Sequence, residues 1–362
     1  MALLTRSTPG TKLLARYEHD NATFPFALAD WLTPDDVTIA NSFGKLQIRY
    51  GTSPDVNWRD VVNTAVASRS KRMVYAHVLA ELGGDLNGSR GVSAHVTDQT
   101  NGSIDSVQCA STIGLGASEF ARLEEWINGA ATRDTEPVAA KTSSVVYPFS
   151  LFVDEAFAAG YDHTGNALVS KALTHTAGQA GIASTNGDLE NWGYVYRYFD
   201  CPDRYVYVNG LPPGSSAQVL NASNAVLASA NTVDGVAIID MLQVLLEEAT
   251  QLVVLDSADV QLASYAPAGD EIIEPGETYD LVSAFISPTS ADLVSGVWPV
   301  QFEEVLGADY HQLDYWDGSN WSLLADNLLA AAGVVTYDWD ASDIPFQTDA
   351  QLRARGVFIV DP

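Results

Sequence analysis

The chain has 362 residues, of which 47% are hydrophobic, so its length and composition predict two or three domains with packed cores rather than a disordered chain. It carries 46 acidic and 18 basic residues, a formal net charge of −28. That balance excludes a nucleic-acid-binding protein, because no basic stripe is present to contact phosphates.

The acidic residues are spread along the chain rather than gathered in a tail, and few of the basic residues are lysines. In about 1 M salt the Debye length falls to about 3 Å, which screens the repulsion within such a surface. The composition resembles that of proteins from extreme halophiles, and we interpret it as adaptation to very high salt. An acidic calcium-binding protein and a mesophilic protein of low pI are the alternatives.

The opening residues, 1–10, have no charged leader followed by an apolar core, so no secretory signal is expected. No window approaches about 18 uninterrupted apolar residues, so no membrane span is expected either. Cys109 and Cys201 are more simply two free, partly buried thiols than a disulfide. No cysteine or histidine cluster has zinc-site spacing, and we expect no cofactor other than a possible calcium ion.

Short apolar runs separated by Gly, Asn, Asp, Ser and Pro predict an all-β chain. In chain order, strands are predicted at Lys45–Tyr50, Met73–Leu79 and Tyr147–Val153, which are rich in aromatic and β-branched residues. Helices are predicted at Ser118–Ile127, whose apolar residues fall on one helical face, and at Met241–Glu248, whose apolar run could instead extend a strand.

The stretch GNALVSKALTHTAGQAGIASTNGDLENWGYVYRYFD resembles the closing strands of concanavalin-like (laminin-G-like) jelly rolls. In those folds a Gly-rich strand, here Ala177–Ser184, precedes a tight turn and a final aromatic strand, here Trp192–Phe199. The resemblance implies an N-terminal jelly-roll domain over residues 1–202.

From residue 203 to 268 turn signals recur about every eight to twelve residues, as in a small sandwich. The string VNGLPPGSSAQVLNASNAVLASANTVDGVAIID resembles small immunoglobulin-like or carboxypeptidase-regulatory-like modules. A linker punctuated by Pro and Gly, Ala266–Gly276, follows. These features predict a small immunoglobulin-like domain at 203–268.

The last part of the chain predicts a further sandwich. A strand at Gln312–Trp316 meets an Asp317–Gly318 turn, and Trp321 begins the return strand. The order YWDGSNW … YDWDASDIP … LRAR resembles a fibronectin-III-type domain, which we place at 269–362. The predicted fold is therefore an N-terminal jelly-roll sandwich followed by two smaller immunoglobulin-like β-sandwiches.

Jelly rolls of this type can hydrolyse glycans with carboxylates placed closely on one strand face. The spacing i, i+2, i+4 does not occur in residues 1–202. Asp154 and Glu155 would point to opposite faces of a strand, and Glu124 and Glu125 lie on the predicted helix as solvated surface. The histidines are scattered, so we expect no catalytic residues and a protein that is not an enzyme.

The best candidate for a ligand surface is Tyr161 with Asp162, His163 and Asn166, since polar groups beside an aromatic ring suit sugar recognition. Trp192 could add a platform, although it is also a good core residue. An ordinary solvated loop is the alternative for the whole group.

Three aspartates, Asp338, Asp340 and Asp343, offer oxygen ligands for calcium. The interpretation that we favour places Trp339 in the core and these aspartates on the acidic surface.

A modular β protein without a leader, made in high salt, resembles surface proteins of tailed haloarchaeal viruses. The resemblance implies a structural virion component (tail, baseplate, or capsid turret or decoration) made in the host cytoplasm. It would assemble as a symmetric homo-oligomer with other virion proteins and bind host-surface glycans through many weak contacts. The alternatives are an extracellular polysaccharide-active enzyme with β-sandwich spacers and a purely structural spacer.

Overall fold

In a computed structural model, the residues described are 3–7, 12–19, 21–33, 37–50, 58–81, 88–98, 105–113, 120–138, 145–164, 167–185, 192–288, 296–305, 307–316, 320–342 and 351–358. These residues form β-strands with two 3₁₀ turns, η1 (Leu28–Asp30) and η2 (Leu246–Glu248). The all-β prediction is confirmed. In this described part, no helix has the length and apolar character that a membrane span requires.

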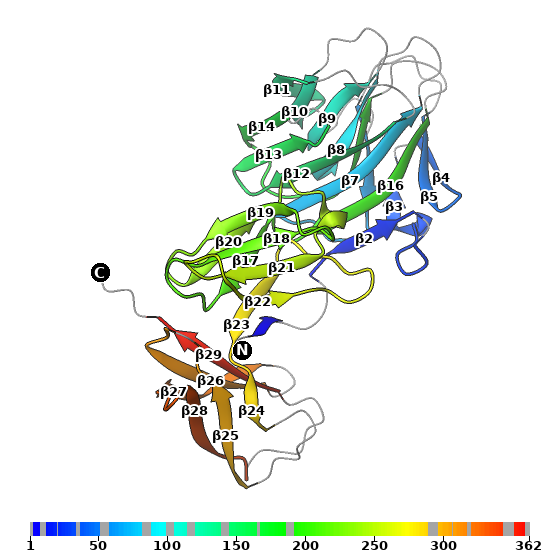
Figure 1. Cartoon of the computed structure of the whole chain (residues 1–362). Helices are drawn as coiled ribbons and strands as arrows, with labels where there is room; N and C mark the ends of the chain where they lie inside the picture. The colour runs from blue at the N-terminus through cyan, green and yellow to red at the C-terminus, as the bar shows by residue number, and fades with distance from the viewer. Residues whose placement is uncertain are drawn as a thin grey trace. The chain divides into compact units, whose positions relative to one another are not determined.

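The chain divides into two compact units (Figure 1). The first, which we call the jelly-roll unit, comprises Thr11–Arg204 with Met241–Leu245. The second, the C-terminal unit, comprises Met1–Gly10, Tyr205–Asp240 and Leu246–Pro362.

The jelly-roll unit consists of two antiparallel sheets. The β7 sheet has the order β14-β13-β12-β7-β16-β5-β4, with β2 beside β16, and the β8 sheet has the order β11-β10-β9-β8-β15-β6-β3. The strands of the β7 sheet are β2 (Ala15–Glu18), β4 (Val37–Ser42), β5 (Lys45–Tyr50), β7 (Arg72–Glu81), β12 (Val146–Val153), β13 (Phe157–Asp162), β14 (Ala167–Ala172) and β16 (Trp192–Cys201). Those of the β8 sheet are β3 (Trp31–Leu32), β6 (Trp58–Asn63), β8 (Gly88–Asp98), β9 (Asp105–Ile113), β10 (Phe120–Ile127), β11 (Ala130–Pro137) and β15 (Gln179–Thr185).

One apolar core lies between these two sheets. Side chains alternate along a strand, so Val74 and Ala76 of β7 point into the core and meet residues such as Val107 and Cys109 of β9. A Cβ on Gly160 of β13 would lie 2.5 Å from the sulfur of Cys109, so glycine is needed for the sheets to pack this closely. Residues between the core positions point to the outer face of each sheet, which is where a ligand surface can form.

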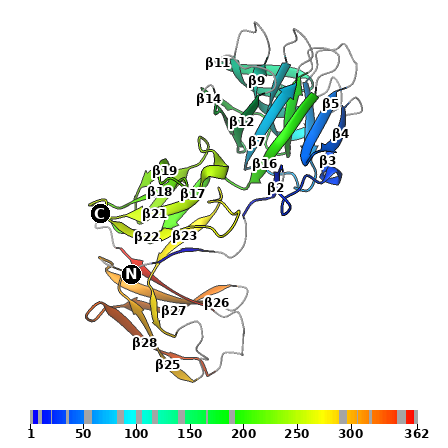
Figure 2. The same ribbon diagram turned by 45° about the vertical axis from the view of Figure 1, so that its right-hand side comes forward.

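The C-terminal unit contains three sheets (Figure 2). The β17 sheet has the order β20-β17-β23-β29-β26-β27, with β1 beside β23; the β18 sheet is β19-β18-β21-β22, and the β25 sheet is β24-β25-β28. Their strands are β1 (Leu3–Arg6), β17 (Tyr205–Asn209), β18 (Ser216–Leu220), β19 (Val226–Asn231), β20 (Val236–Asp240), β21 (Gln251–Leu255), β22 (Gln261–Tyr265), β23 (Thr278–Val282), β24 (Phe285–Ser287), β25 (Val297–Glu303), β26 (Tyr310–Trp316), β27 (Trp321–Leu328), β28 (Val334–Asp340) and β29 (Gln351–Val357).

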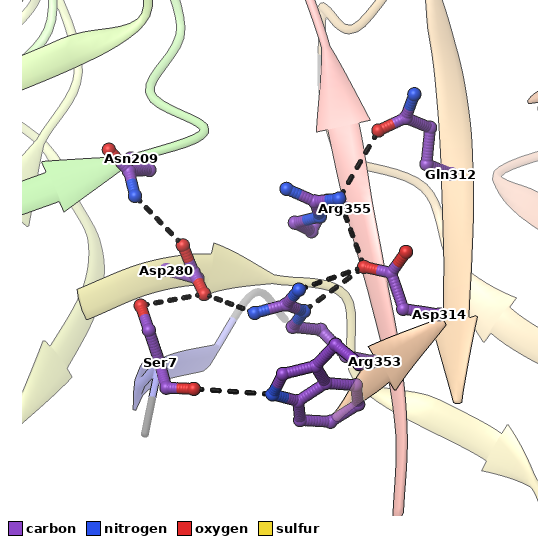
Figure 3. A network of polar contacts seen from close by, with 8 residues as sticks. Ser7, Asn209, Asp280, Gln312, Asp314, Arg353 and Arg355 are labelled. Atoms are coloured by element: carbon purple, nitrogen blue, oxygen red, sulfur yellow. Dashed lines mark hydrogen bonds and ion pairs between the residues drawn. The ribbon is translucent and has the colours of Figure 1, made fainter. Parts of the chain in front are cut away.

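A polar network joins β1, β23, β26 and β29 (Figure 3). Arg353 of β29 donates to Asp314 of β26 at 3.0 and 3.1 Å and to Asp280 of β23 at 2.8 Å. Ser7, just after β1, donates to Asp280 at 2.8 Å. The guanidinium of Arg353 also lies 4.3 Å from the ring centroid of Trp321, whose Nε1 donates to the carbonyl of Ser7. We call this set the Arg353 junction.

The predicted helix at Ser118–Ile127 is wrong. Residues 120–127 form β10, which pairs with β9 and β11. Ala121 and Leu123 enter the core while Arg122 and Glu124 alternate onto the outer face, so the sequence also fits a two-residue period. Pairing on both edges decides between the two patterns.

The second predicted helix, Met241–Glu248, reduces to the single turn η2. Its apolar residues, including Met241 and Leu246, are buried without forming a regular helix. The strands predicted at Lys45–Tyr50, Met73–Leu79 and Tyr147–Val153 are confirmed as β5 and as parts of β7 and β12.

Two pairings cross the predicted domain boundaries. Leu3–Arg6, expected within 1–202, pairs with β23 of the C-terminal unit. The regions 203–268 and 269–362 contribute strands to one β17 sheet, in which β17 pairs in parallel with β23 and Val208 is in register with Tyr279. Contacts so distant in sequence leave no local signal. Division of the C-terminal unit into two domains stays a prediction, and the Asp317–Gly318 turn lies outside the described residues.

Candidate functional site

The outer face of the β7 sheet carries the two predicted residues that the structure brings together. Tyr161 ends β13 on that face, and the ring of His163 meets the ring of Tyr161 at 4.7 Å between centroids in an edge-on contact. Both side chains are half-buried. Burial, and next the charge of Asp162, raise the pKa of Tyr161, so its hydroxyl remains protonated at neutral pH and can donate a hydrogen bond.

Asp162 does not belong to this surface, which corrects the prediction. Because alternate residues of a strand point to opposite faces, its carboxylate lies on the core side of the sheet, where it is fully buried. It accepts hydrogen bonds from the Thr164 backbone N–H at 2.9 Å and the Thr164 hydroxyl at 2.7 Å, and another from Ser111 of the opposite sheet. Asp162 therefore stabilises a turn and the packing of the two sheets.

The other two predicted residues are Asn166 and Trp192. Asn166 lies outside the described residues. Trp192 opens β16 and pairs in register with Glu81 of β7, six residues beyond Tyr75. At about 3.3 Å per residue, its backbone is roughly 20 Å along the strand from the level of Tyr75.

Three residues that sequence reasoning missed lie beside these two side chains, and two of them, Tyr75 and Ser150, are fully buried. Tyr75 of β7 pairs in register with Ser150 of β12, which in turn pairs with Tyr161. The Ser150 hydroxyl lies 2.8 Å from Nε2 of His163, and the Tyr75 hydroxyl lies 2.8 Å from Nε2 of His77. The rings of Tyr75 and His163 meet edge-on at 5.6 Å. We call Tyr75, His77, Ser150, Tyr161 and His163 the ring cluster.

The ring cluster is held rigidly from below. Tyr75 is fully buried, and its ring stacks on that of Phe199 in β16 at 5.8 Å with an interplanar angle of 15°. His77, two residues along β7, is half-buried. The available signal was the i, i+2 spacing of Tyr75 and His77, which puts both on one face, opposite core residues such as Val74.

The acidic pair of β10 was expected on the surface, and both residues are buried. Glu124 forms an ion pair with Arg133 at 3.0 Å and accepts a hydrogen bond from the Trp126 indole at 3.1 Å, yet burial raises its pKa. Burial also acts to raise the pKa of Glu125, but hydrogen bonds from His175 and Thr174 outweigh it and lower that pKa. The cause of the error is the helix prediction, since these residues form a strand with a neighbour on each edge.

The structure describes two of the three predicted calcium ligands. Asp338 and Asp340 are exposed on β28, and Asp343 lies outside the described residues. Asp340 accepts a hydrogen bond from the Ser342 backbone at 3.0 Å, and bonding to Ser342 lowers its pKa. Trp339 is buried against Tyr315, as the core interpretation predicts. Within the described ranges, no group of three or more His, Cys, Asp or Glu side chains could hold a metal ion.

No protein-family model matches the chain, and no curated protein sequence matches it. Among solved structures it is similar to the carbohydrate binding module CBM66 from Bacillus subtilis, with 16% identity and a TM-score of 0.33 over 46% of this chain and 94% of that one. It is also similar to a legume lectin-like domain from Entamoeba histolytica (7% identity, TM-score 0.38, 53% and 98% covered). A third is the β-glucanase of Bacillus licheniformis (9% identity, TM-score 0.35, 52% and 97% covered). At these values the likeness concerns the β fold alone.

The expectation that the chain is not an enzyme is wrong, because an enzymatic activity is not excluded for it. Proteins named as a β-glucanase and a kappa-carrageenase are among the structures that it resembles. Fold class by itself does not separate enzymes from binding domains.

Proposed function

We propose that the chain is a glycan-binding protein and that the ring cluster is its sugar-binding surface. The observation that carries the proposal is the contact of Tyr161 with His163 beside the Ser150 hydroxyl, on an outward face of the jelly-roll unit. A pyranose ring offers C–H bonds on its faces and hydroxyls around its edge. Half-buried rings next to imidazole nitrogens and hydroxyls can contact both.

The preorganisation of the cluster favours binding. The buried Tyr75 and Phe199 rings, together with the 2.8 Å contact between Ser150 and His163, fix the half-buried groups in place. A ligand then loses little affinity to ordering of the protein. A single shallow surface of this kind binds weakly, so useful affinity needs several copies acting together.

We further propose that the protein is a structural component of a virion surface (tail, baseplate, or capsid turret or decoration) of a tailed haloarchaeal virus. In this proposal a symmetric homo-oligomer contacts other virion proteins and presents its glycan surfaces to the host. The net charge of −28 and the modular β fold support it. An extracellular polysaccharide-active enzyme with β-sandwich spacers is the second candidate.

The test is binding of the full chain to a panel of oligosaccharides in about 3 M salt. Tyr161→Ala and His163→Ala should each weaken binding to any oligosaccharide recognised by about fivefold or more, since each removes an aromatic contact worth on the order of 1 kcal/mol or more. Phe43→Ala is the control, because Phe43 is an aromatic residue 90% exposed in the turn between β4 and β5.

Equal loss in all three variants, or unchanged binding in the Tyr161 and His163 variants, contradicts the proposed surface. Release of reducing sugar from the same oligosaccharides, measured in parallel, would favour the enzyme.

A further inference from the structure

Asp60 is a fully buried carboxylate with no cationic partner in the described residues. It lies on the outer face of the β8 sheet, because its neighbour Val61 enters the core. Two other buried carboxylates have an arginine beside them: Arg72 lies 3.1 Å from Asp200, and Arg133 lies 3.0 Å from Glu124. Asp60 therefore carries a buried charge that the described side chains do not neutralise.

The groups around Asp60 are rich in oxygen and poor in donors. Nε2 of Gln108 donates to both carboxylate oxygens of Asp60 at 3.0 Å and to the hydroxyl of Ser106 at 3.1 Å. The hydroxyls of Ser93 and Ser106 also form hydrogen bonds with the carboxylate, and these bonds lower its pKa. Burial has the larger effect and raises the pKa of Asp60 to about 6. One amide nitrogen thus serves three acceptors.

Oε1 of Gln108, a residue 1% exposed, has no hydrogen-bond partner in the described part of the chain. The hydroxyl of Ser93, a residue 0% exposed, lies beside the Asp60 carboxylate. A buried oxygen without a donor is unfavourable and needs a ligand or water to satisfy it. These atoms come from three strands, β6, β8 and β9, that the sheet order places near one another.

The backbone makes this convergence possible. Gly181 of β15 stands in register between Ser93 of β8 and Val62 of β6. A Cβ on Gly181 would lie 2.2 Å from the carbonyl oxygen of Val61, so only glycine lets these strands approach so closely. With no side chain at Gly181, Gln108 can reach across the sheet to Asp60.

We infer that Asp60, Ser93, Ser106 and Gln108 form a binding site for a hard cation, Na⁺ or Ca²⁺. A half-turn of the Gln108 amide places Oε1 where Nε2 lies, 3.0 Å from both Asp60 oxygens and 3.1 Å from Ser106. Oxygens about 3 Å apart are spaced as ligands of one such ion, which binds each at about 2.3–2.6 Å. The ion neutralises Asp60 and gives Oε1 of Gln108 a partner. The site is separate from the ring cluster, which lies on the other sheet.

The test is thermal unfolding of the full chain, followed by circular dichroism, after removal of cations with a chelator. Tetramethylammonium chloride holds the ionic strength constant, since this ion is too large and too weakly coordinating for the site. Adding CaCl₂ or NaCl should raise the melting temperature of the wild type. Saturation at micromolar to millimolar CaCl₂ identifies calcium, and a response only to NaCl at about 0.1 M or more identifies sodium.

Asp60→Asn should abolish the cation-dependent shift, and without added cation it should melt at or above the wild-type temperature because the buried charge is gone. Ser93→Ala, which removes one ligand without changing charge, should weaken cation affinity about tenfold. This variant keeps the test valid if Asp60→Asn does not fold. Asp340→Asn, an exposed aspartate, is the matched control and should keep the full shift. A wild type that responds to neither cation at constant ionic strength, or an Asp60→Asn variant that keeps the shift, overturns the inference.

Discussion

Arg72 and Asp200 form an ion pair with both side chains fully buried, at 3.1 Å between Nη1 and Oδ2. The same guanidinium donates to the Ala67 carbonyl at 2.8 Å, so it is bonded on two sides. Burial raises the pKa of Asp200 to about 6, and Arg72 acts against that rise. The pair supports β7 and β16 beneath the ring cluster.

We predict that Arg72→Met lowers the free energy of unfolding by about 3–5 kcal/mol, because it leaves Asp200 buried without its partner. The double variant Arg72→Met with Asp200→Asn should be less destabilised than the single one, since the orphaned charge is also removed. Denaturant unfolding in high salt measures both. If the loss of unfolding free energy in the double variant equals the sum of the losses from the two single substitutions, the two residues do not pair directly.

Glu277 gives a residue-scale prediction of pH dependence. Burial raises its pKa to about 7, against hydrogen bonding from Tyr279 and the Arg6 guanidinium at 3.0 Å. The native state therefore binds more protons than the unfolded state between about pH 4.5 and 7, and the contribution of Glu277 to stability falls as pH rises through that window.

Glu277→Gln should flatten this part of the stability profile, because glutamine does not titrate. Comparing unfolding free energies of variant and wild type at pH 5 and pH 8 tests it. Relative to the wild type, the variant should have a higher unfolding free energy at pH 8 than at pH 5. The same difference at both pH values would refute the raised pKa of Glu277.

At the scale of elements, the sequence predicted the positions of many strands but not which strands pair with one another. The runs at β5, β7 and β12 were identified from their aromatic and β-branched residues. β10 was misread because its residues fit both a helical and an alternating period, and only β9 and β11 decide between them. Likewise, Tyr161 and Asp162 are adjacent in sequence yet face opposite sides of β13.

The ring cluster illustrates the same limit. Tyr161 and His163 were found as neighbours in sequence, whereas Tyr75, His77 and Ser150 join them through strand register, which no local pattern specifies. Asp60 was missed for the same reason, since its partners lie on β8 and β9.

The Arg353 junction supplies an element-scale prediction. Arg353→Lys keeps the charge but loses the fork that reaches Asp280 and Asp314 together, and weakens stacking on Trp321. It should destabilise the protein by about 1–3 kcal/mol.

Arg355→Lys is the control, since Arg355 also pairs with Asp314 but is more exposed. Arg355→Lys should lower the free energy of unfolding by less than about 1 kcal/mol. Equal costs in denaturant unfolding would show that Arg353 does not have the distinct role that we assign to it.

At the scale of the whole molecule, the net charge of −28 predicts dependence on salt. Lowering the salt from about 3 M to about 0.1 M increases the Debye length several-fold, to about 10 Å. The acidic side chains then repel one another more strongly. We expect a clearly lower melting temperature by circular dichroism at the lower salt. Equal stability at both would contradict the proposed adaptation to high salt.

Glycan recognition by the ring cluster is most directly tested by determining the structure of the full chain with a bound oligosaccharide in high salt. The account predicts a sugar ring against Tyr161 and His163, with sugar hydroxyls bonded to groups of the ring cluster. A sugar found on the outer face of the β8 sheet, or on the C-terminal unit with the ring cluster vacant, would contradict it.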